Sequence, residues 1–142
     1  MSMSPVTSVR LATQADLGEL TRRDRLPEAE LAAILGRGRI LLAAVNDTEG
    51  FVGWLRWGLF WDEVPFMNRL HVDEPHRGAG IGRLLVGECE RACSRDGHGT
   101  VMTSTLSAES AQHFYRKLGY TDAGCLCLPG ESAEIFFIKN IG

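Results

Sequence analysis

The spacing of hydrophobic positions changes between strand-like and helix-like along the chain, which predicts a mixed α/β domain. Two apolar runs rich in strand formers, residues 39–46 and 51–60, flank a polar stretch at 47–50 and predict a β-hairpin. The proline and the acids of residues 61–65 predict a loop after it. Further strands are expected at residues 8–12, 66–72, 100–105, 120–128 and 133–139.

Four segments carry apolar residues at the i, i+3, i+4 spacing of an amphipathic helix or have helix start and stop signals. Thr13 is a candidate N-cap for a helix that carries Leu17 and Leu20. Pro27 and Gly36 bracket a second helix, as expected of a first-turn proline and a glycine just past the end. The other two are predicted at residues 81–92 and 111–118, the last ending at Gly119.

Composition fits one globular domain over residues 1–142, since 44% of the residues are hydrophobic and 23% are charged. The net charge of −3 and the lack of a basic run argue against a nucleic-acid partner. No leader or long apolar run suggests a membrane, so we expect a cytoplasmic protein. Neither cysteine pair has CxxC spacing, which predicts no metal site and four reduced thiols, most of them buried.

The most informative stretch is the glycine-rich segment Arg77-Gly78-Ala79-Gly80-Ile81-Gly82 between a predicted strand and a predicted helix. Glycines there bring successive backbone N–H groups within reach of an anion at the helix N-terminus, which is typical of phosphate binding. The segment fits neither a Walker loop nor a dinucleotide fingerprint. The alternative interpretation is a tight strand-to-helix turn with no ligand.

This segment resembles the Arg/Gln-x-x-Gly-x-Gly/Ala signature of the GNAT superfamily of N-acetyltransferases, whose loop binds the pyrophosphate of acetyl-CoA. Residues 111–120, with Phe114-Tyr115-Arg116-Lys117-Leu118-Gly119-Tyr120, resemble the fourth helix of that family. The order of predicted elements matches over nearly the whole chain. The resemblance implies a GNAT fold of the α/β (α+β) class: a mixed, mostly antiparallel sheet of six to seven strands, about four helices on both faces, and splayed fourth and fifth strands.

The resemblance also implies which residues bind acetyl-CoA. The pantetheine arm would pair with the strand around Leu70, and the departure from the family pattern is Ala108, where many members carry Asn. Ser107 and Glu109 are the nearest polar replacements. The expected cofactor-binding residues are Leu70, His71, Val72, Arg77, Gly78, Ala79, Gly80, Ile81, Gly82, Arg83, Ser107 and Tyr115.

Tyr115 matches the general acid of the family, which protonates the leaving thiolate, although its place on the inward helix face also fits a core tyrosine. The candidate bases that would accept the proton of the attacking amine are His71, Glu74, Glu63 and Asp62.

The acceptor end is expected at Trp61, Asp62 and Glu63, because acids beside an aromatic surface suit a cationic amine; a solvated acidic loop is the alternative. The partners implied by the resemblance are acetyl-CoA and an amine acceptor, which is a small molecule or a protein. A catalytically weak CoA-binding sensor or interaction module of the same fold is the competing interpretation. The resemblance also allows a homodimer, and transfer of longer acyl groups stays open.

Overall fold

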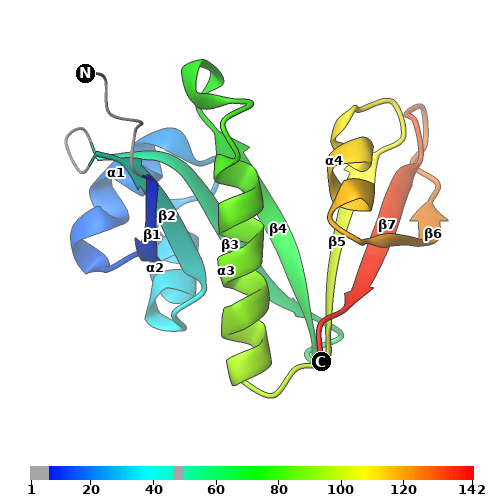
Figure 1. The fold of residues 1–142 in the computed structure, drawn as a ribbon, viewed down its shortest axis with the longest axis horizontal. Helices are drawn as coiled ribbons and strands as arrows, with labels where there is room; N and C mark the ends of the chain where they lie inside the picture. The colour runs from blue at the N-terminus through cyan, green and yellow to red at the C-terminus, as the bar shows by residue number, and fades with distance from the viewer. Residues whose placement is uncertain (1–6, 47–49) are drawn as a thin grey trace, which may run out of the picture. The chain divides into compact units, whose positions relative to one another are not determined.

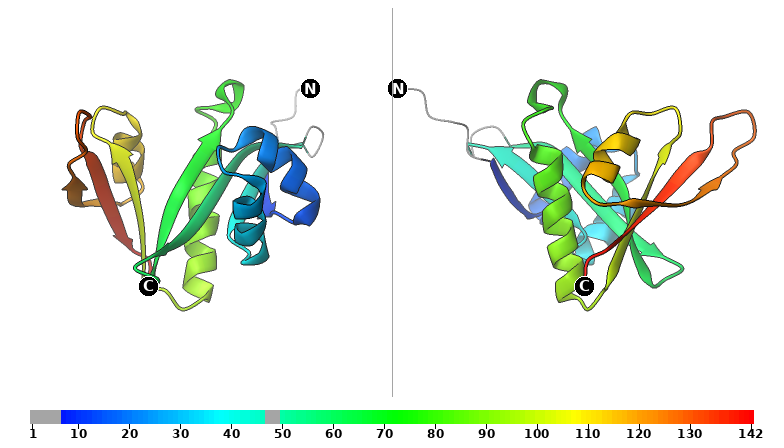
Figure 2. Two further views of the ribbon diagram at one scale, coloured as in Figure 1. Left: turned by 180° about the vertical axis from the view of Figure 1, so that it is seen from behind. Right: turned by 45° about the vertical axis from the view of Figure 1, so that its right-hand side comes forward.

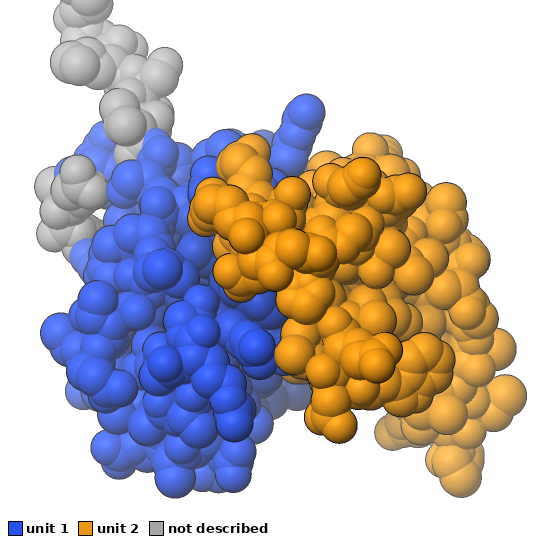
Figure 3. Space-filling model, turned by 90° about the horizontal axis from the view of Figure 1, so that it is seen from below, with its two compact units in different colours: residues 1–58, 69–89 blue, residues 59–68, 90–142 orange. Residues whose placement is uncertain are grey.

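The computed structural model describes residues 7–46 and 50–142, so residues 47–49 of the predicted hairpin turn lie outside the described residues. The chain divides into two compact units, coloured separately in Figure 3. The first unit consists of residues 1–58 and 69–89 as far as they are described, and the second of residues 59–68 and 90–142.

Seven strands form one mixed sheet in the order β1-β2-β3-β4-β5-β7-β6, which confirms the predicted α/β fold class. In the described residues β4 and β5 pair in parallel, whereas β1–β2, β2–β3, β5–β7 and β6–β7 are antiparallel. The predicted splaying of β4 from β5 stays a prediction.

The first unit begins with β1 (Thr7–Leu11), α1 (Leu17–Arg23), α2 (Glu28–Gly36), β2 (Ile40–Val45) and β3 (Phe51–Phe60). The prediction of Thr13 as the N-cap of the helix with Leu17 and Leu20 is wrong, because a 3₁₀ turn at Gln14–Asp16 comes between them and Asp16 is the N-cap of α1. Thr13 caps the 3₁₀ turn instead, and its N–H donates to Asp16 at 2.7 Å. Figures 1 and 2 show α1 and α2 on one face of β2 and β3, and α3 on the other. A buried cluster on the α1–α2 side unites the fully buried Leu20, Leu31 and Trp54.

A β-bulge in β3 sets which side chains share that cluster. Ala43 pairs with Gly53 and Ala44 with Phe51, so Val52 is an extra residue. The extra residue turns Phe51 toward the same face as Trp54, and their rings meet edge to face at 5.8 Å. The hydrophobic alternation of β3 therefore shifts by one position at Val52.

The turn between β3 and β4 (Val64–Val72) is shorter than the sequence predicts. The prediction of a loop over residues 61–65 is wrong at its end, because β4 begins at Val64 and contains the buried Pro65. Trp61 and Asp62 both have left-handed φ angles, 56° and 60°, and the N–H of Glu63 donates to the carbonyl of Phe60 at 3.1 Å. These features define a type I′ turn with Trp61 and Asp62 at its two central positions, without the glycine that usually marks one.

Asp62→Gly is expected to raise the free energy of unfolding by about 0.5–1 kcal/mol, because glycine adopts a left-handed φ without the clash of a Cβ atom. Urea denaturation measures the change. Glu63→Gly is the matched control, since Glu63 has no left-handed φ and should lose stability when its backbone is made more flexible. A lower stability for Asp62→Gly would contradict the assigned turn.

The rest of the chain forms α3 (Ile81–Arg95), β5 (Thr100–Leu106), α4 (Ala111–Lys117), β6 (Thr121–Leu126) and β7 (Glu134–Asn140). Gly119 has φ +95°, which confirms its predicted place just after α4. In the second unit Glu90 accepts hydrogen bonds from the Tyr120 hydroxyl at 2.7 Å and from Lys139 at 3.1 Å. These contacts join the C-terminal half of α3 to Lys139 of β7 and to Tyr120, which precedes β6.

The expected burial of most cysteines is wrong for the C-terminal pair. Cys89 and Cys93 are buried on α3, but Cys125 and Cys127 are exposed, because they lie on or beside the exposed edge strand β6. None of the four is in a disulfide. Within the described ranges, no helix has the length and apolar character needed to cross a bilayer.

Candidate functional site

The glycine-rich segment leaves β4 through a short 3₁₀ turn at Glu74–His76 and enters α3 at Ile81. The Nε of Arg77 donates to the carbonyl of Val72 at 2.8 Å, so this side chain holds the loop against the strand end. Gly78 and Gly80 have φ angles of +81° and +83°, which L-residues rarely adopt. Both glycines are thus required by the backbone conformation itself.

The space in front of these two glycines is open. A Cβ atom built on Gly78 or Gly80 would meet no atom within 4 Å, so packing does not explain the lack of side chains. The first turn of α3 contains no acidic residue, and the N–H of Leu84 makes the first helical hydrogen bond, to Gly80. The backbone N–H groups of residues 81–83 therefore have no helical carbonyl to bond to and can donate to a ligand. A phosphate group fits this arrangement.

The other residues of the glycine-rich segment differ in how exposed they are. Ala79 and Arg83 are exposed beside the open space, whereas the Ile81 side chain is buried, with 2% exposure, and anchors the helix start. Gly82 is already helical. Only Arg83 in the first turn of α3 adds a side-chain cation that suits an anionic ligand.

His71 lies on β4 in a chain of polar contacts that sequence reasoning missed. Its Nε2 is 3.2 Å from Asp73, and Asp73 accepts two hydrogen bonds from Arg23, at 2.6 and 2.7 Å. The imidazole also packs against Trp54, with ring centroids 4.7 Å apart. In the tautomer protonated at Nε2, that N–H donates to Asp73 and leaves Nδ1 able to accept a proton.

The main chain of β4 around His71 is approached closely by β3. A Cβ atom on Gly53 would lie 2.8 Å from the carbonyl oxygen of His71 and 3.4 Å from Val72, so only glycine fits there. Leu70 and Val72, the other predicted cofactor-binding residues of this strand, are half-buried. Glu74, a candidate base, is exposed at the start of the 3₁₀ turn, and its carbonyl accepts from the N–H of Arg77.

Tyr115 lies in the second unit, on the buried face of α4, with 6% exposure. Its ring contacts those of Phe114, Tyr120 and Phe137 at centroid distances of 5.1, 5.7 and 6.2 Å. The surrounding aromatic rings fix the direction of the ring. Such fixation suits both a core tyrosine and a positioned acid.

The loop between β5 and α4 is held by Gln112, which sequence reasoning did not single out. Its Nε2 donates to the carbonyls of Ser107 and Glu109, at 2.8 and 2.9 Å. The N–H of Ser107 donates to the carbonyl of Ala133, so the main chain of Ser107 is occupied and its exposed hydroxyl remains. Gln112 thus orders the loop at the position where Ala108 replaces the asparagine of the family pattern.

An acidic group that the sequence did not highlight lies on β7. Burial raises the pKa of Glu134, a hydrogen bond with Ser104 opposes this, and the charges of Glu109 and Glu131 raise the pKa further. Glu134 belongs to the same unit as Tyr115. The second unit thus has a carboxylate that accepts protons more readily than an exposed one.

The predicted acceptor residues Trp61, Asp62 and Glu63 form the exposed hairpin turn described above, and 77% of Trp61 is exposed. The Trp61 ring contacts Phe60 at 4.6 Å. These three belong to the second unit with Tyr115 and Ser107, whereas His71, Glu74 and the glycine loop belong to the first. The predicted site residues are therefore divided between the two units.

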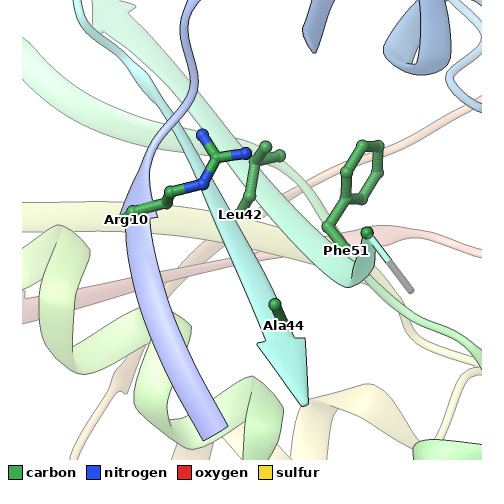
Figure 4. A pocket seen from close by; sticks show the side chains of 5 residues that line it. Arg10, Leu42, Ala44 and Phe51 are labelled. Carbon is green, nitrogen blue, oxygen red and sulfur yellow. The ribbon is translucent and has the colours of Figure 1, made fainter. Parts of the chain in front are cut away.

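A shallow surface pocket of about 150 Å³ opens beside the N-terminal strand (Figure 4). It is lined by Arg10 of β1, Leu42 and Ala44 of β2, and Gly50 and Phe51 at the start of β3. The Arg10 guanidinium is paired with Asp16 at 2.9 Å, so its charge is compensated. None of these residues is a predicted site residue. Among the residues that the structure describes, no group of three or more His, Cys, Asp or Glu side chains could hold a metal ion.

Comparison with known proteins links this geometry to a family model described as an acetyltransferase (GNAT) domain, which matches residues 36–122. No curated protein matches the sequence. Ard1 from Thermoplasma volcanium has a similar structure, with TM-score 0.79 and 16% identity over 94% of this chain and 97% of that one.

Two further solved structures show the same fold. The ribosomal-protein-S18-alanine N-acetyltransferase from Escherichia coli has TM-score 0.75 and 17% identity, covering 96% of this chain and 94% of its own. The yncA protein from Salmonella typhimurium, solved with its cofactor acetyl-CoA, has TM-score 0.77 and 18% identity, covering 96% and 94%.

Proposed function

Because the chain belongs to the GNAT acetyltransferase family, we propose that it is an acetyl-CoA-dependent N-acetyltransferase that moves the acetyl group directly to an amine. The observation that carries the proposal is the open loop at Gly78 and Gly80, where left-handed backbone and empty space precede the start of α3. We further propose that residues 1–142 act as one catalytic domain, since the family match extends over parts of both units.

The loop residues would hold the diphosphate of acetyl-CoA through main-chain N–H groups, with the charge of Arg83 beside them. Arg77 keeps the loop on the strand end through its bond to Val72. The exposed hydroxyl of Ser107 and the buried ring of Tyr115 would complete the site in the second unit. Acetyl-CoA supplies the thioester whose acyl group is transferred.

His71 and Tyr115 would move the protons of the reaction. As the amine nitrogen bonds to the acyl carbon and the carbon–sulfur bond breaks, His71 would accept the amine proton at Nδ1 and Tyr115 would protonate the leaving sulfur. Asp73, fixed by Arg23, stabilises the imidazolium that forms. Glu74, Glu63 and Asp62 remain the alternative bases.

Acetyl-CoA binding tests the loop assignment. Gly80→Ala is expected to weaken binding about five- to thirtyfold, because a left-handed alanine costs about 1–2 kcal/mol that the loop must bear to keep its conformation. Titration calorimetry measures the change. Gly97→Ala is the matched control, since Gly97 has φ +92° and equally open space but follows the other end of α3. Equal affinities in both variants would contradict the assignment.

Thiol release from acetyl-CoA across a panel of amines separates the enzyme from a CoA-binding sensor or interaction module of the same fold. An amine-dependent rate supports transfer, whereas tight binding with no acceptor turned over supports the sensor. The cytoplasmic location and a homodimer remain part of the proposal and are tested by fractionation and by the mass in solution.

A further inference from the structure

A group of arginines around Trp54 in the first unit carries more positive charge than its acidic neighbours compensate. It comprises Arg23, Arg25, Arg56 and Arg69 with the two aspartates Asp24 and Asp73. Arg23 is paired with Asp73, and Arg56 is paired with Asp24 at 2.9 Å. Two of the four arginines, Arg25 and Arg69, are left over.

Asp24 cannot accept further hydrogen bonds from Arg25 or Arg69. Its Oδ1 accepts from the N–H of Leu26 and from Arg56, and its Oδ2 accepts from Trp54 and again from Arg56. A carboxylate offers about four lone-pair sites, and all are in use. In the described part of the chain, no hydrogen bond or ion pair engages the guanidinium of Arg25 or Arg69.

Arg69 is the less favourably placed of the two cations. Its Nε is buried without a hydrogen-bond partner, and the side chain lies 5.9 Å from the Trp54 ring. Burial lowers the pKa of Arg69, and the charges of Arg25 and Arg56 lower it further, with Asp24 as the opposing charge. A native structure rarely keeps a buried donor unsatisfied without a reason, and a bound anion would supply the missing partner.

The position of Arg69 suggests where that anion comes from. Arg69 and His71 are alternate residues of β4, so their side chains leave the same face of the strand, and both lie against Trp54. Two strand positions span about 6.6 Å. An anionic group at Arg69 and an amine that gives its proton to His71 could therefore belong to one small acceptor molecule or one peptide end.

We propose that the acceptor is an amine that also carries an anionic oxygen group, a carboxylate or a phosphate, held by Arg69 and Arg25. This inference rests on the proposed acetyl transfer. It opposes the sequence-based expectation of a cationic amine at Asp62 and Glu63.

Matched pairs of amines test the proposal: aspartic acid α-amide against asparagine α-amide, phosphoethanolamine against ethanolamine, and a peptide amide beginning with Asp against one beginning with Asn. We expect the anionic member of at least one pair to have a kcat/KM at least about tenfold higher, as for a charged hydrogen bond. The preferred pair then shows whether the anionic group is a carboxylate or a phosphate. It also shows whether the acceptor is a small amine or the N-terminus of a peptide.

The ratio within the preferred pair is expected to fall toward one in Arg69→Gln and in Arg25→Gln, while acetyl-CoA affinity is unchanged. Arg25 is exposed, so its variant should fold even where Arg69→Gln does not. Arg37→Gln removes an equally exposed charge at the end of α2 and should keep the ratio.

Turnover without an anionic preference, or a preference for 1,4-diaminobutane, would overturn this inference and leave the proposed function intact. Failure to bind acetyl-CoA would overturn both.

Discussion

Replacing Asp24 by alanine is expected to lower the free energy of unfolding by about 3–5 kcal/mol, because the buried charge of Arg56 loses its partner. The Asp24 side chain is fully buried and accepts four hydrogen bonds, one of them from the indole N–H of Trp54 at 2.9 Å. Its loss also leaves that N–H without an acceptor. Urea denaturation followed by tryptophan fluorescence measures the change.

The matched control is Asp122→Ala. Asp122 accepts two hydrogen bonds from Arg116 at 2.9 Å, the same bidentate arrangement, but 56% of its side chain is exposed. Exposed pairs contribute little because water and salt screen them, so this variant should change stability far less. Similar losses in both variants would show that burial of the Asp24–Arg56 pair does not determine its contribution.

The pH dependence of the Asp24 effect has a defined sign. Burial alone would raise the pKa of Asp24, but the hydrogen bonds from Arg56, Trp54 and Leu26 outweigh it and hold the pKa below its usual value. A carboxylate with a lowered folded-state pKa stabilises fully above its unfolded pKa of about 3.9 and loses this as the pH falls. The difference between wild type and Asp24→Ala should therefore shrink below about pH 4.

Features that depend on residues close together in the sequence could be predicted. The strand at residues 51–60 has the predicted bounds, and the left-handed Gly119 ends α4 as expected. The hairpin turn was missed, because Trp61 and Asp62 adopt left-handed angles that the sequence normally marks with glycine or asparagine. The order of strands and helices followed from hydrophobic periodicity, since that signal is repeated along the whole chain, and the fold class was implied by the family resemblance.

The candidate site divides in the same way. The conformation of the glycine loop is local, so the spacing of Gly78 and Gly80 was informative. The polar contacts around His71 and Trp54 could not be predicted from spacing. Arg23, which binds Asp73 beside His71, lies 50 residues from Asp73, and Asp24 lies 30 residues from Trp54. Such pairs depend on how α1 packs on the sheet, which no short-range pattern records.

Tyr115→Phe is expected to lower kcat for amine acetylation by about 10²-fold or more, because the leaving thiolate loses its proton donor. The change removes one oxygen from a ring that Phe114, Tyr120 and Phe137 hold in place, so the fold and the acetyl-CoA affinity should be retained. Steady-state kinetics and titration calorimetry measure the two quantities separately.

Tyr120→Phe separates an acid from a core tyrosine. Tyr120 is buried in the same aromatic cluster, with 2% exposure, and its hydroxyl donates to Glu90. Its variant should lose about 1.5–3 kcal/mol of stability, as for a hydrogen bond to a charged group, and keep kcat. A general acid must be protonated, so the wild-type rate should also fall at alkaline pH in a limb that Tyr115→Phe lacks. If Tyr115→Phe instead kept its kcat and lost stability as Tyr120→Phe does, the hydroxyl would serve the core and the thiolate would take its proton from water.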